Sequence, residues 1–181
     1  MTGRSVESDI RNLLSDKEIA TGVVCMLCGV AGSGKTTLAL KLEQRGLVRL
    51  SIDEYIWQHF GRYGLDYGPE LYSEHQSNAR HNLDEQLTHL LREGTPAVLD
   101  YSLWQRTERQ RYVTLIEQHG RPWRLLVLDQ PPSVIRVRLA ARRRRFDANA
   151  AFAIEDDLLG QYLATFERPH GEGETVISSS M

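Results

Sequence analysis

Long apolar runs are scarce in this chain of 181 residues. No uninterrupted apolar segment approaches the ~18 residues that a membrane-spanning helix needs, which excludes a membrane protein. The first ten residues mix charged and hydroxyl side chains without an apolar centre, so they do not resemble a secretory signal. We therefore expect a cytoplasmic protein with no membrane partner.

Cysteine is also scarce, since Cys25 and Cys28 are the only two in the sequence. They lie in an apolar run that predicts a strand, where their spacing points the two side chains to opposite faces. Such a pair does not suit a disulfide or a zinc site. We expect both residues to be buried as small hydrophobic side chains.

No charge of one sign predominates, because 22 Lys and Arg residues stand against 24 Asp and Glu, for a formal net charge of −2. A chain without a global positive field is not drawn as a whole to nucleic acid or anionic lipid. Any basic site must be local. Lysine occurs only at positions 17, 35 and 41.

The remaining pattern is that of an α/β protein. The chain has the length of one ordinary domain, and its 41% hydrophobic and 25% charged residues are typical of a globular one. Short apolar runs alternate with segments of helical period, which predicts βαβ units and a mainly parallel sheet. The expected strands are 23–28, 47–52, 97–100 and 123–129, with a fifth at 175–177. We divide the chain into an N-terminal helical extension, 1–20, with Ile10, Leu13 and Leu14 on one side, and a domain, 21–181.

Helices are expected between the strands. The first, 35–44, is followed after the second strand by a loop or flexible cap over 61–72. A capping box at Ser73 to Gln76 predicts the start of a helix that ends at Gly94. Further helices are expected from Thr107 to His119, from Val134 into the arginine run 142–145, and over 154–166.

A phosphate-binding loop lies between the first strand and the first helix. Residues 29–36 read G-V-A-G-S-G-K-T and match G-x-x-x-x-G-K-[ST] in the required context. Its backbone N–H groups and the helix N-terminus should bind phosphates. Lys35 should neutralise the β- and γ-phosphates, and the Thr36 hydroxyl should bind Mg²⁺. The expected nucleotide-binding residues are Gly29, Val30, Ala31, Gly32, Ser33, Gly34, Lys35, Thr36 and Thr37.

Three acidic residues follow predicted strands. Asp53 is placed at the carboxyl edge of the sheet, where it could accept a proton from an attacking hydroxyl or simply cap the next turn. Asp100 ends an apolar strand in the manner of the Mg²⁺-organising carboxylate of phosphate-loop proteins. Asp129 also ends an apolar strand. The metal role is assigned to Asp100, with Asp129 as the alternative.

Arginines cluster at the end of a predicted helix. Arg138, Arg142 and Arg145 share a helical face and could clamp a transferring phosphoryl group, whereas Arg143 and Arg144 point elsewhere. The alternative is a solvated basic helix end. In the segment 55–72, six rings would suit a sugar or heterocycle acceptor above Asp53, or would pack on the domain surface. They are Trp57, His59, Phe60, Tyr63, Tyr67 and Tyr72.

Together, these motifs resemble the small phosphate-loop kinases, which include gluconate kinase, chloramphenicol and zeta-toxin phosphotransferases, the kinase domain of polynucleotide kinase, and AAA-family ATP-binding proteins. The resemblance covers Val23 to about Ile177. It rests on the stretches 29–37, 51–54, 98–104, 106–109 and 138–142. It implies a three-layer fold with a five-stranded parallel sheet, ATP with Mg²⁺, Asp53 as base, and a lid carrying Arg138 and Arg142. A conventional sugar-acid site cannot be traced through 57–72, which argues against gluconate. The stretch from Asp53 to His75 offers only Arg62 as a Lys or Arg residue, which argues against nucleic acid.

The function predicted from these features is transfer of the γ-phosphate of ATP to a hydroxyl of a small molecule, such as a sugar, a nucleoside-like compound or an antibiotic. Lys35, Asp53, Arg138 and Arg142 are the expected catalytic residues, and Thr36 and Asp100 the expected metal ligands. The alternatives are a nucleotide-binding ATPase or switch without an acceptor, and a zeta-toxin-like or polynucleotide kinase. The sequence leaves the acceptor, the oligomeric state and the choice of ATP or GTP open.

Overall fold

The computed structural model describes residues 13–143, 147–150 and 154–178. Its strands are β1 (Val24–Cys28), β2 (Val48–Leu50), β3 (Ala97–Leu99), β4 (Trp123–Asp129) and β5 (Glu174–Ser178). Its helices are α2 (Asp16–Ala20), α3 (Lys35–Glu43), α4 (Ile52–Phe60), α5 (Pro69–Glu93), α6 (Arg106–Gln118), α7 (Pro132–Arg142), the short 3₁₀ helix η1 (Ala148–Ala150) and α8 (Asp156–Thr165).

The five strands form one parallel sheet in the order β2-β3-β1-β4-β5. Val24 on the central strand pairs with Ala97 of β3 and with Trp123 of β4, which fixes the register on both sides. The order places the loop after β1 in the middle of the carboxyl edge, with the β2 and β3 ends on one side and the β4 and β5 ends on the other. Ligands of open α/β sheets bind at this edge. The predicted α/β class and five-stranded parallel sheet are confirmed.

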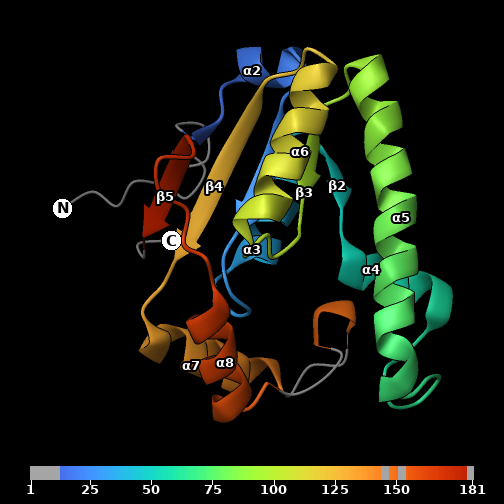
Figure 1. Cartoon of the computed structure of the whole chain (residues 1–181), viewed down its shortest axis with the longest axis vertical. Helices are drawn as coiled ribbons and strands as arrows, with labels where there is room; N and C mark the ends of the chain where they lie inside the picture. The colour runs from blue at the N-terminus through green and yellow to red at the C-terminus, as the bar shows by residue number, and fades with distance from the viewer. Residues whose placement is uncertain (1–12, 144–146, 151–153, 179–181) are drawn as a thin grey trace.

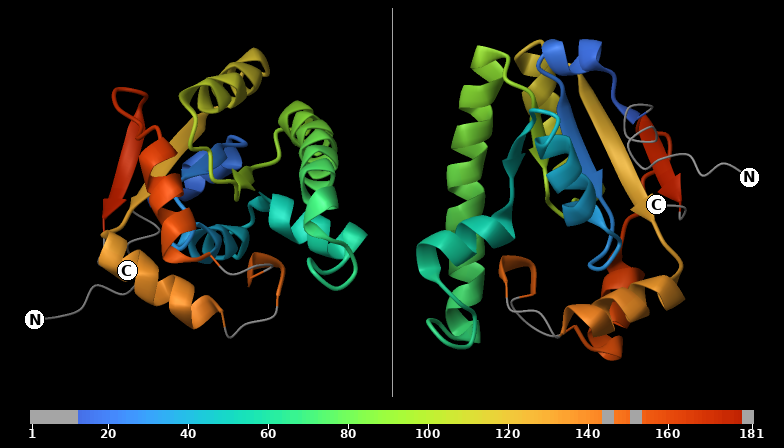
Figure 2. Two further views of the ribbon diagram at one scale, coloured as in Figure 1. Left: turned by 60° about the horizontal axis from the view of Figure 1, so that its bottom comes forward. Right: turned by 180° about the vertical axis from the view of Figure 1, so that it is seen from behind.

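Two hydrophobic cores, one on each face of the sheet, produce the three layers. Apolar residues of α5 and α6, among them Leu87, Leu91 and Ile116, pack with Met26 of β1 on one face. Leu38, Ala39 and Leu42 of α3 pack on the other face. Figure 1 shows α6 in front of the sheet, and the right panel of Figure 2 shows α3 on the opposite side. The 3.6-residue spacing of α5 and the alternation along β1 explain these two faces.

The cysteines behave as predicted. Cys25 contributes to the core under α3 and Cys28 to the core under α5 and α6, and both are free and buried. Burial raises the pKa of the Cys25 thiol to about 12 and that of Cys28 to about 11. Such thiols stay protonated at neutral pH and serve as packing groups.

The end of the second predicted strand is wrong. The structure ends β2 at Leu50, and Ile52 begins α4 instead of continuing the strand. Ser51 is the N-cap, because its side chain accepts a hydrogen bond from the backbone N–H of Glu54 at 3.4 Å. Asp53 and Glu54 then place negative charge in the first helical turn, where the helix dipole favours it. The S-x-x-E pattern of Ser51 to Glu54 is the sequence signal that could have revealed this start.

The predicted start of the following helix is also wrong. Helix α5 begins at Pro69, so the last four residues of the expected 61–72 loop are helical, and Ser73 lies within the helix instead of capping it. Proline suits the first helical position, since its fixed φ is helical and its missing N–H would have no partner there. None of the helices that the structure describes combines the length and hydrophobicity needed to cross a bilayer.

Part of the N-terminal segment packs on the domain. Leu14 is 1% exposed and joins the core beneath α3, with Leu13 packed at its edge. A capping box between Ser15 and Glu18 begins α2 directly afterwards. Ile10, which was expected on the same apolar side, lies outside the described residues. Leu14 thus attaches the start of the described chain to the sheet.

Candidate active site

The phosphate loop wraps around the N-terminus of α3. Gly34 caps the helix with φ 107°, a left-handed conformation that favours glycine, and a Cβ there would lie 3.3 Å from a guanidinium nitrogen of Arg138. Gly32 has φ 81°, and a Cβ there would approach Leu139 of α7 at 3.1 Å. The loop is thus formed as the motif predicts, and α7 packs directly against it. The Ser33 hydroxyl is buried and, within the described part of the chain, has no hydrogen-bond partner.

Lys35 folds back over the loop. Its Nζ donates hydrogen bonds to the carbonyl oxygens of Gly29 at 2.8 Å and Val30 at 3.0 Å. Burial lowers the pKa of Lys35, while the nearby carboxylates of Asp100 and Asp53 act in the opposite direction. The ammonium group therefore lies at the centre of the loop with both candidate carboxylates in its field.

Asp100 lies beside Thr36 and is held by an arginine that the sequence analysis did not identify. The Thr36 hydroxyl donates to Asp100 Oδ1 at 3.4 Å, and Arg49 Nε and Nη2 donate to Asp100 Oδ2 at 3.0 and 2.8 Å. The side chains of Arg49 and Asp100 are 8% and 2% exposed. Arg49 thus orients one carboxylate oxygen and leaves the other facing Thr36.

A hydroxyl next to a carboxylate oxygen is the kind of donor set that Mg²⁺ takes from proteins, with water and phosphate completing its shell. The residues present therefore fit the ion. In the described part of the chain no three His, Cys, Asp or Glu side chains cluster as a metal site. The alternative residue Asp129 accepts a hydrogen bond from Arg168 and does not line the cavity of the site. The geometry favours Asp100 over Asp129.

Asp53 reaches the same region from the first turn of α4. Asp53 is an exposed residue, yet it lines the cavity and neighbouring protein atoms desolvate its carboxylate. Burial raises the pKa of Asp53, and the charge of Arg142 is the largest influence that opposes this shift. Asp100, Lys35 and Arg49 also act on the Asp53 charge. The structure thus brings Asp53 and Lys35 together, although they lie on different helices.

Two of the predicted arginines face the loop. Arg138 Nη1 donates to the carbonyl oxygen of Ser33 at 2.9 Å, and Arg142, one turn further along α7, lines the cavity and lies in the field of Asp53. Arg143 instead pairs with Glu155 at 2.6 Å on the surface, as its place on the helix predicted. Arg144 and Arg145 lie outside the described residues.

One cavity of about 630 Å³ lies at the carboxyl edge of the sheet, and its lining includes the phosphate loop, Asp53, Asp100, Arg138 and Arg142. Helices α7 and α8 lie beyond this edge, below the strand ends in Figure 1 and toward the viewer in the left panel of Figure 2. On the β4 and β5 side the cavity is lined by Leu128, Gln130, Ile177 and Ser178, with Leu40 and Lys41 of α3. On the β2 and β3 side its lining includes Asp53, Tyr72, Gln76, Ser102, Trp104 and Tyr162. We call these two parts of the cavity its arms, because the phosphate loop follows β1, which lies between β3 and β4 in the sheet.

The predicted aromatic roof is mostly wrong. Of the six rings named for it, only Tyr72 lines the cavity. Tyr67 and its neighbours pack with Ile56 and Ala79 in a small core between α4 and α5. Phe60 stacks on His75 with ring centroids 4.0 Å apart, and Tyr63 contacts the edges of Tyr67 and Tyr72. The alternative interpretation, packing on the domain, holds for Phe60, Tyr63 and Tyr67, because α4 and the early start of α5 turn these rings toward each other.

The rest of the wall of the β2-side arm comes from residues that were not predicted to line a site. Ser102 and Trp104 follow β3, Gln76 comes from α5 and Tyr162 from α8. Trp104 meets the edge of Tyr162 with ring centroids 5.0 Å apart. The sequence did contain a signal for Ser102 and Trp104. Both follow Asp100 at the carboxyl end of a predicted strand, where ligands of parallel sheets bind.

Comparison with known structures gives the same fold. A protein from Chloroflexus aurantiacus described as a candidate kinase superposes with a TM-score of 0.65 at 18% identity, with 87% of each chain covered. A gluconokinase from Sinorhizobium meliloti superposes with a TM-score of 0.57 at 19% identity over 90% of this chain and 85% of that one. The APS kinase CysC from Mycobacterium tuberculosis, solved with AMPPNP and APS, gives a TM-score of 0.55 at 15% identity over 89% and 90%.

No curated protein matches the sequence. A family model described as an AAA domain, AAA_33, matches residues 24–169, which is more than half of the chain and includes the phosphate loop, Asp53, Asp100 and both loop-facing arginines. The chain therefore belongs to the AAA_33 family and has the fold of the small phosphate-loop kinases.

Proposed function

We propose that this protein transfers the γ-phosphate of ATP to a hydroxyl group of a small molecule. The observation that supports this most directly is the place of Asp53, whose carboxylate shares one cavity with Lys35 and the phosphate loop. Burial raises the pKa of Asp53, which makes its carboxylate a better proton acceptor than an ordinary aspartate. An acceptor hydroxyl must lose a proton during transfer, whereas nucleotide binding alone requires no such group.

The proposed mechanism assigns a role to each group at the cavity. The loop N–H groups and Lys35 hold the β- and γ-phosphates, and Arg138 and Arg142 bind oxygens of the transferring group. Mg²⁺, held by Thr36 and organised by Asp100, would neutralise phosphate charge when bound. The acceptor oxygen bonds to the γ-phosphorus as the bond from that phosphorus to the bridging oxygen of ADP breaks. The acceptor proton passes to Asp53.

The two arms of the cavity suit the two substrates. The nucleoside of ATP would occupy the β4 and β5 side, between α3 and Gln130, because Asp53 lies on the other side of the loop. The acceptor would then lie on the β2 and β3 side, where Asp53 can reach its hydroxyl. A sugar, a nucleoside-like compound or an antibiotic fits the polar and aromatic lining of that arm.

A screen of ATP consumption against a panel of hydroxyl compounds tests this proposal. At least one compound should stimulate ADP release well above the rate with ATP alone, and a phosphorylated product should appear in equal amount. ADP release that stays at its basal rate with every compound, with inorganic phosphate as the product, would favour an ATPase without an acceptor.

Asp100→Asn should have its largest effect on Mg²⁺-dependent nucleotide binding, which it should weaken. The neutral amide is a poorer partner for Thr36-bound Mg²⁺ and leaves the buried Arg49 without its carboxylate. Half-maximal binding of a fluorescent ATP analogue should then require about ten- to a hundredfold more Mg²⁺. Asp129→Asn is the matched control and should bind as the unmodified protein does. The reverse result for the two variants would transfer the metal role to Asp129.

Helix α7 should become more protected from hydrogen exchange when a triphosphate is bound. Arg138 and Arg142 lie on the side of α7 that borders the cavity, and phosphate oxygens would give their guanidinium groups new partners. We expect slower exchange over residues 139–143 with a non-hydrolysable ATP analogue, and no change in α6. Equal exchange over α7 in both conditions would reduce the arginine cluster to a solvated helix end.

A further inference from the structure

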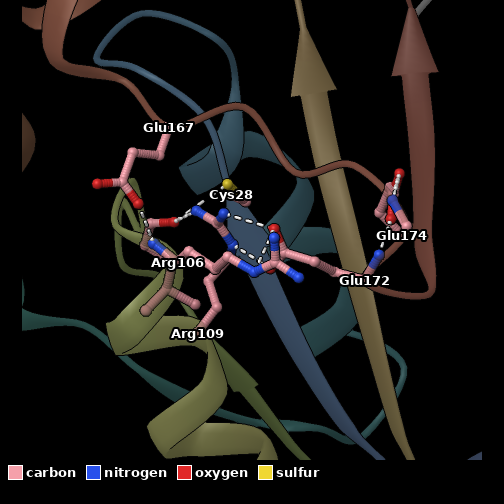
Figure 3. Close-up of polar contacts among 8 residues, drawn as sticks. Cys28, Arg106, Arg109, Glu167, Glu172 and Glu174 are labelled. Carbon is pink, nitrogen blue, oxygen red and sulfur yellow. Dashed lines mark hydrogen bonds and ion pairs between the residues drawn. The ribbon is translucent and has the colours of Figure 1, made fainter.

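The turn between β3 and α6, residues 100–105, is held by a network of polar contacts around the buried Arg109 (Figure 3). Arg109 of α6 is 1% exposed, and its Nε and Nη2 donate to the two carboxylate oxygens of Glu172 at 2.8 Å each. Its Nη1 donates to the carbonyl oxygen of Leu103 at 2.9 Å. The thiol of Cys28 donates to the same carbonyl oxygen at 3.2 Å. Arg109 thus joins the turn to the segment that precedes β5.

Three consecutive carbonyl groups of this turn are held. The Ser102 carbonyl accepts from the backbone N–H of Gly29 in the phosphate loop at 3.1 Å, and the Trp104 carbonyl accepts from that of Glu167 at 3.0 Å. Leu103, between them, has φ 42° and is the only non-glycine residue with positive φ in the described part of the chain. A left-handed leucine is strained, so the surrounding contacts must hold it in place.

Glu167 and Glu172 are themselves fixed. The Glu167 carboxylate accepts from the backbone N–H of Arg106 at 2.7 Å, and the Glu172 backbone N–H donates to the Glu174 carboxylate at 2.7 Å. Hydrogen bonds from Arg109 lower the pKa of Glu172, so its carboxylate is charged at neutral pH. The network extends from α6 through the turn to the edge strand, and it leaves the turn little freedom to move.

The strained conformation places Ser102 and Trp104 in the wall of the cavity. Since β3 lies between β2 and β1 in the sheet, these residues lie on the same side of the phosphate loop as Asp53. The indole of Trp104 is braced by the Tyr162 ring, and Tyr72 and Gln76 also line this arm. An aromatic face next to hydroxyl and amide groups binds the apolar face of a ring and the polar groups at its rim.

We propose that Trp104 determines acceptor specificity by packing against a ring of the acceptor, that the acceptor is therefore a cyclic hydroxyl compound such as a sugar or nucleoside, and that Arg109 and Glu172 are positioning residues for this wall. The inference rests on the proposed function. In this arrangement the ring of the acceptor packs against the 100–105 turn, and its reacting hydroxyl lies next to Asp53.

Fluorescence of Trp104 tests the binding step without turnover. A protein with Trp57→Phe and Trp123→Phe retains only this indole, and it is saturated with AMPPNP before titration. Ribose, glucose, inositol and adenosine should shift or quench its emission, whereas the acyclic glycerol and sorbitol should not. Emission that no cyclic compound changes, in a protein whose ATP turnover one of them stimulates, would overturn the inference and leave the proposed function intact.

Kinetics of two variants test specificity and positioning. Trp104→Ala should raise the KM of the stimulating cyclic compound about tenfold or more, while the affinity for a fluorescent ATP analogue stays unchanged. Trp57→Ala, a tryptophan outside the cavity lining, is the matched control and should not change this KM. An unchanged KM in Trp104→Ala contradicts the specificity role.

Glu172→Gln preserves shape but removes the charge that pairs with Arg109. We expect it to raise the acceptor KM in the same direction, and to increase acrylamide quenching of Trp104 in the single-tryptophan protein. If the variant has a lower melting temperature but an unchanged acceptor KM and unchanged quenching, Arg109 and Glu172 have only a structural role. If no hydroxyl compound stimulates ATP turnover by the unmodified protein or by any variant, the proposed function itself is contradicted.

Discussion

Lys35→Ala is expected to lower phosphate transfer by at least about 10²- to 10³-fold, the scale on which removal of one preorganised charge-stabilising group acts. Lys35 Nζ already lies among the loop carbonyls, with Asp100 and Asp53 in its field, so its position is set before substrates bind. The variant loses the cation that would stabilise the transferring group, and ATP binding should weaken with it. Coupled measurement of ADP release and titration with a fluorescent ATP analogue provide the two readouts.

The fold of this variant should persist, because the Lys35 side chain bonds to loop carbonyls and takes no part in either sheet core. Lys17→Ala, which removes an exposed lysine of α2, is the matched control and should keep full activity. The assignment fails if Lys35→Ala retains normal turnover. A variant that unfolds, as judged by circular dichroism, would show instead that Lys35 is a structural residue.

Asp53→Asn should lower turnover by roughly 10²-fold or more, the contribution of a general base, and leave ATP affinity nearly unchanged. The amide keeps the size of the side chain at the start of α4 but cannot accept the acceptor proton. Steady-state kinetics with the stimulating acceptor and analogue titration separate the two effects. Asp66→Asn, at an exposed carboxylate paired with Arg62, is the control and should be silent. A parallel loss of ATP affinity would make Asp53 a metal or structural residue.

The same residue gives the rate a defined pH dependence. Burial raises the pKa of Asp53 above the ordinary value of 3.8, so the carboxyl becomes protonated as the pH falls through a value higher than that. Its protonated form cannot accept a proton, and kcat should therefore decrease on the acid side. Because asparagine does not titrate, the residual activity of Asp53→Asn should lack this acid limb. An identical acid limb in both proteins would assign it to another group.

Much of the fold follows from local patterns. Alternation along β1 places Cys25 and Cys28 in opposite cores, and the spacing of Leu83, Leu87 and Leu91 buries one side of α5. The phosphate loop is recognisable because glycine spacing and its flanking strand and helix are all contiguous in sequence. Helix starts were less well predicted: Ser73 lies inside α5, which begins at Pro69, and α4 begins at Ile52 after the Ser51 cap.

By itself, the sequence determined the α/β class, the parallel sheet, the phosphate loop and the expectation that Asp53 and Asp100 lie near it, because each depends on residues close together along the chain or on the shared edge of parallel strands. Only the tertiary structure decided which side chains surround the cavity. Arg49 meets Asp100 across 51 positions and Arg109 meets Glu172 across 63. The order of the strands and the packing of the helices determine which residues meet over such distances along the chain. For this reason most of the rings predicted to cover the acceptor pack in a separate core, and Trp104 lines the cavity wall.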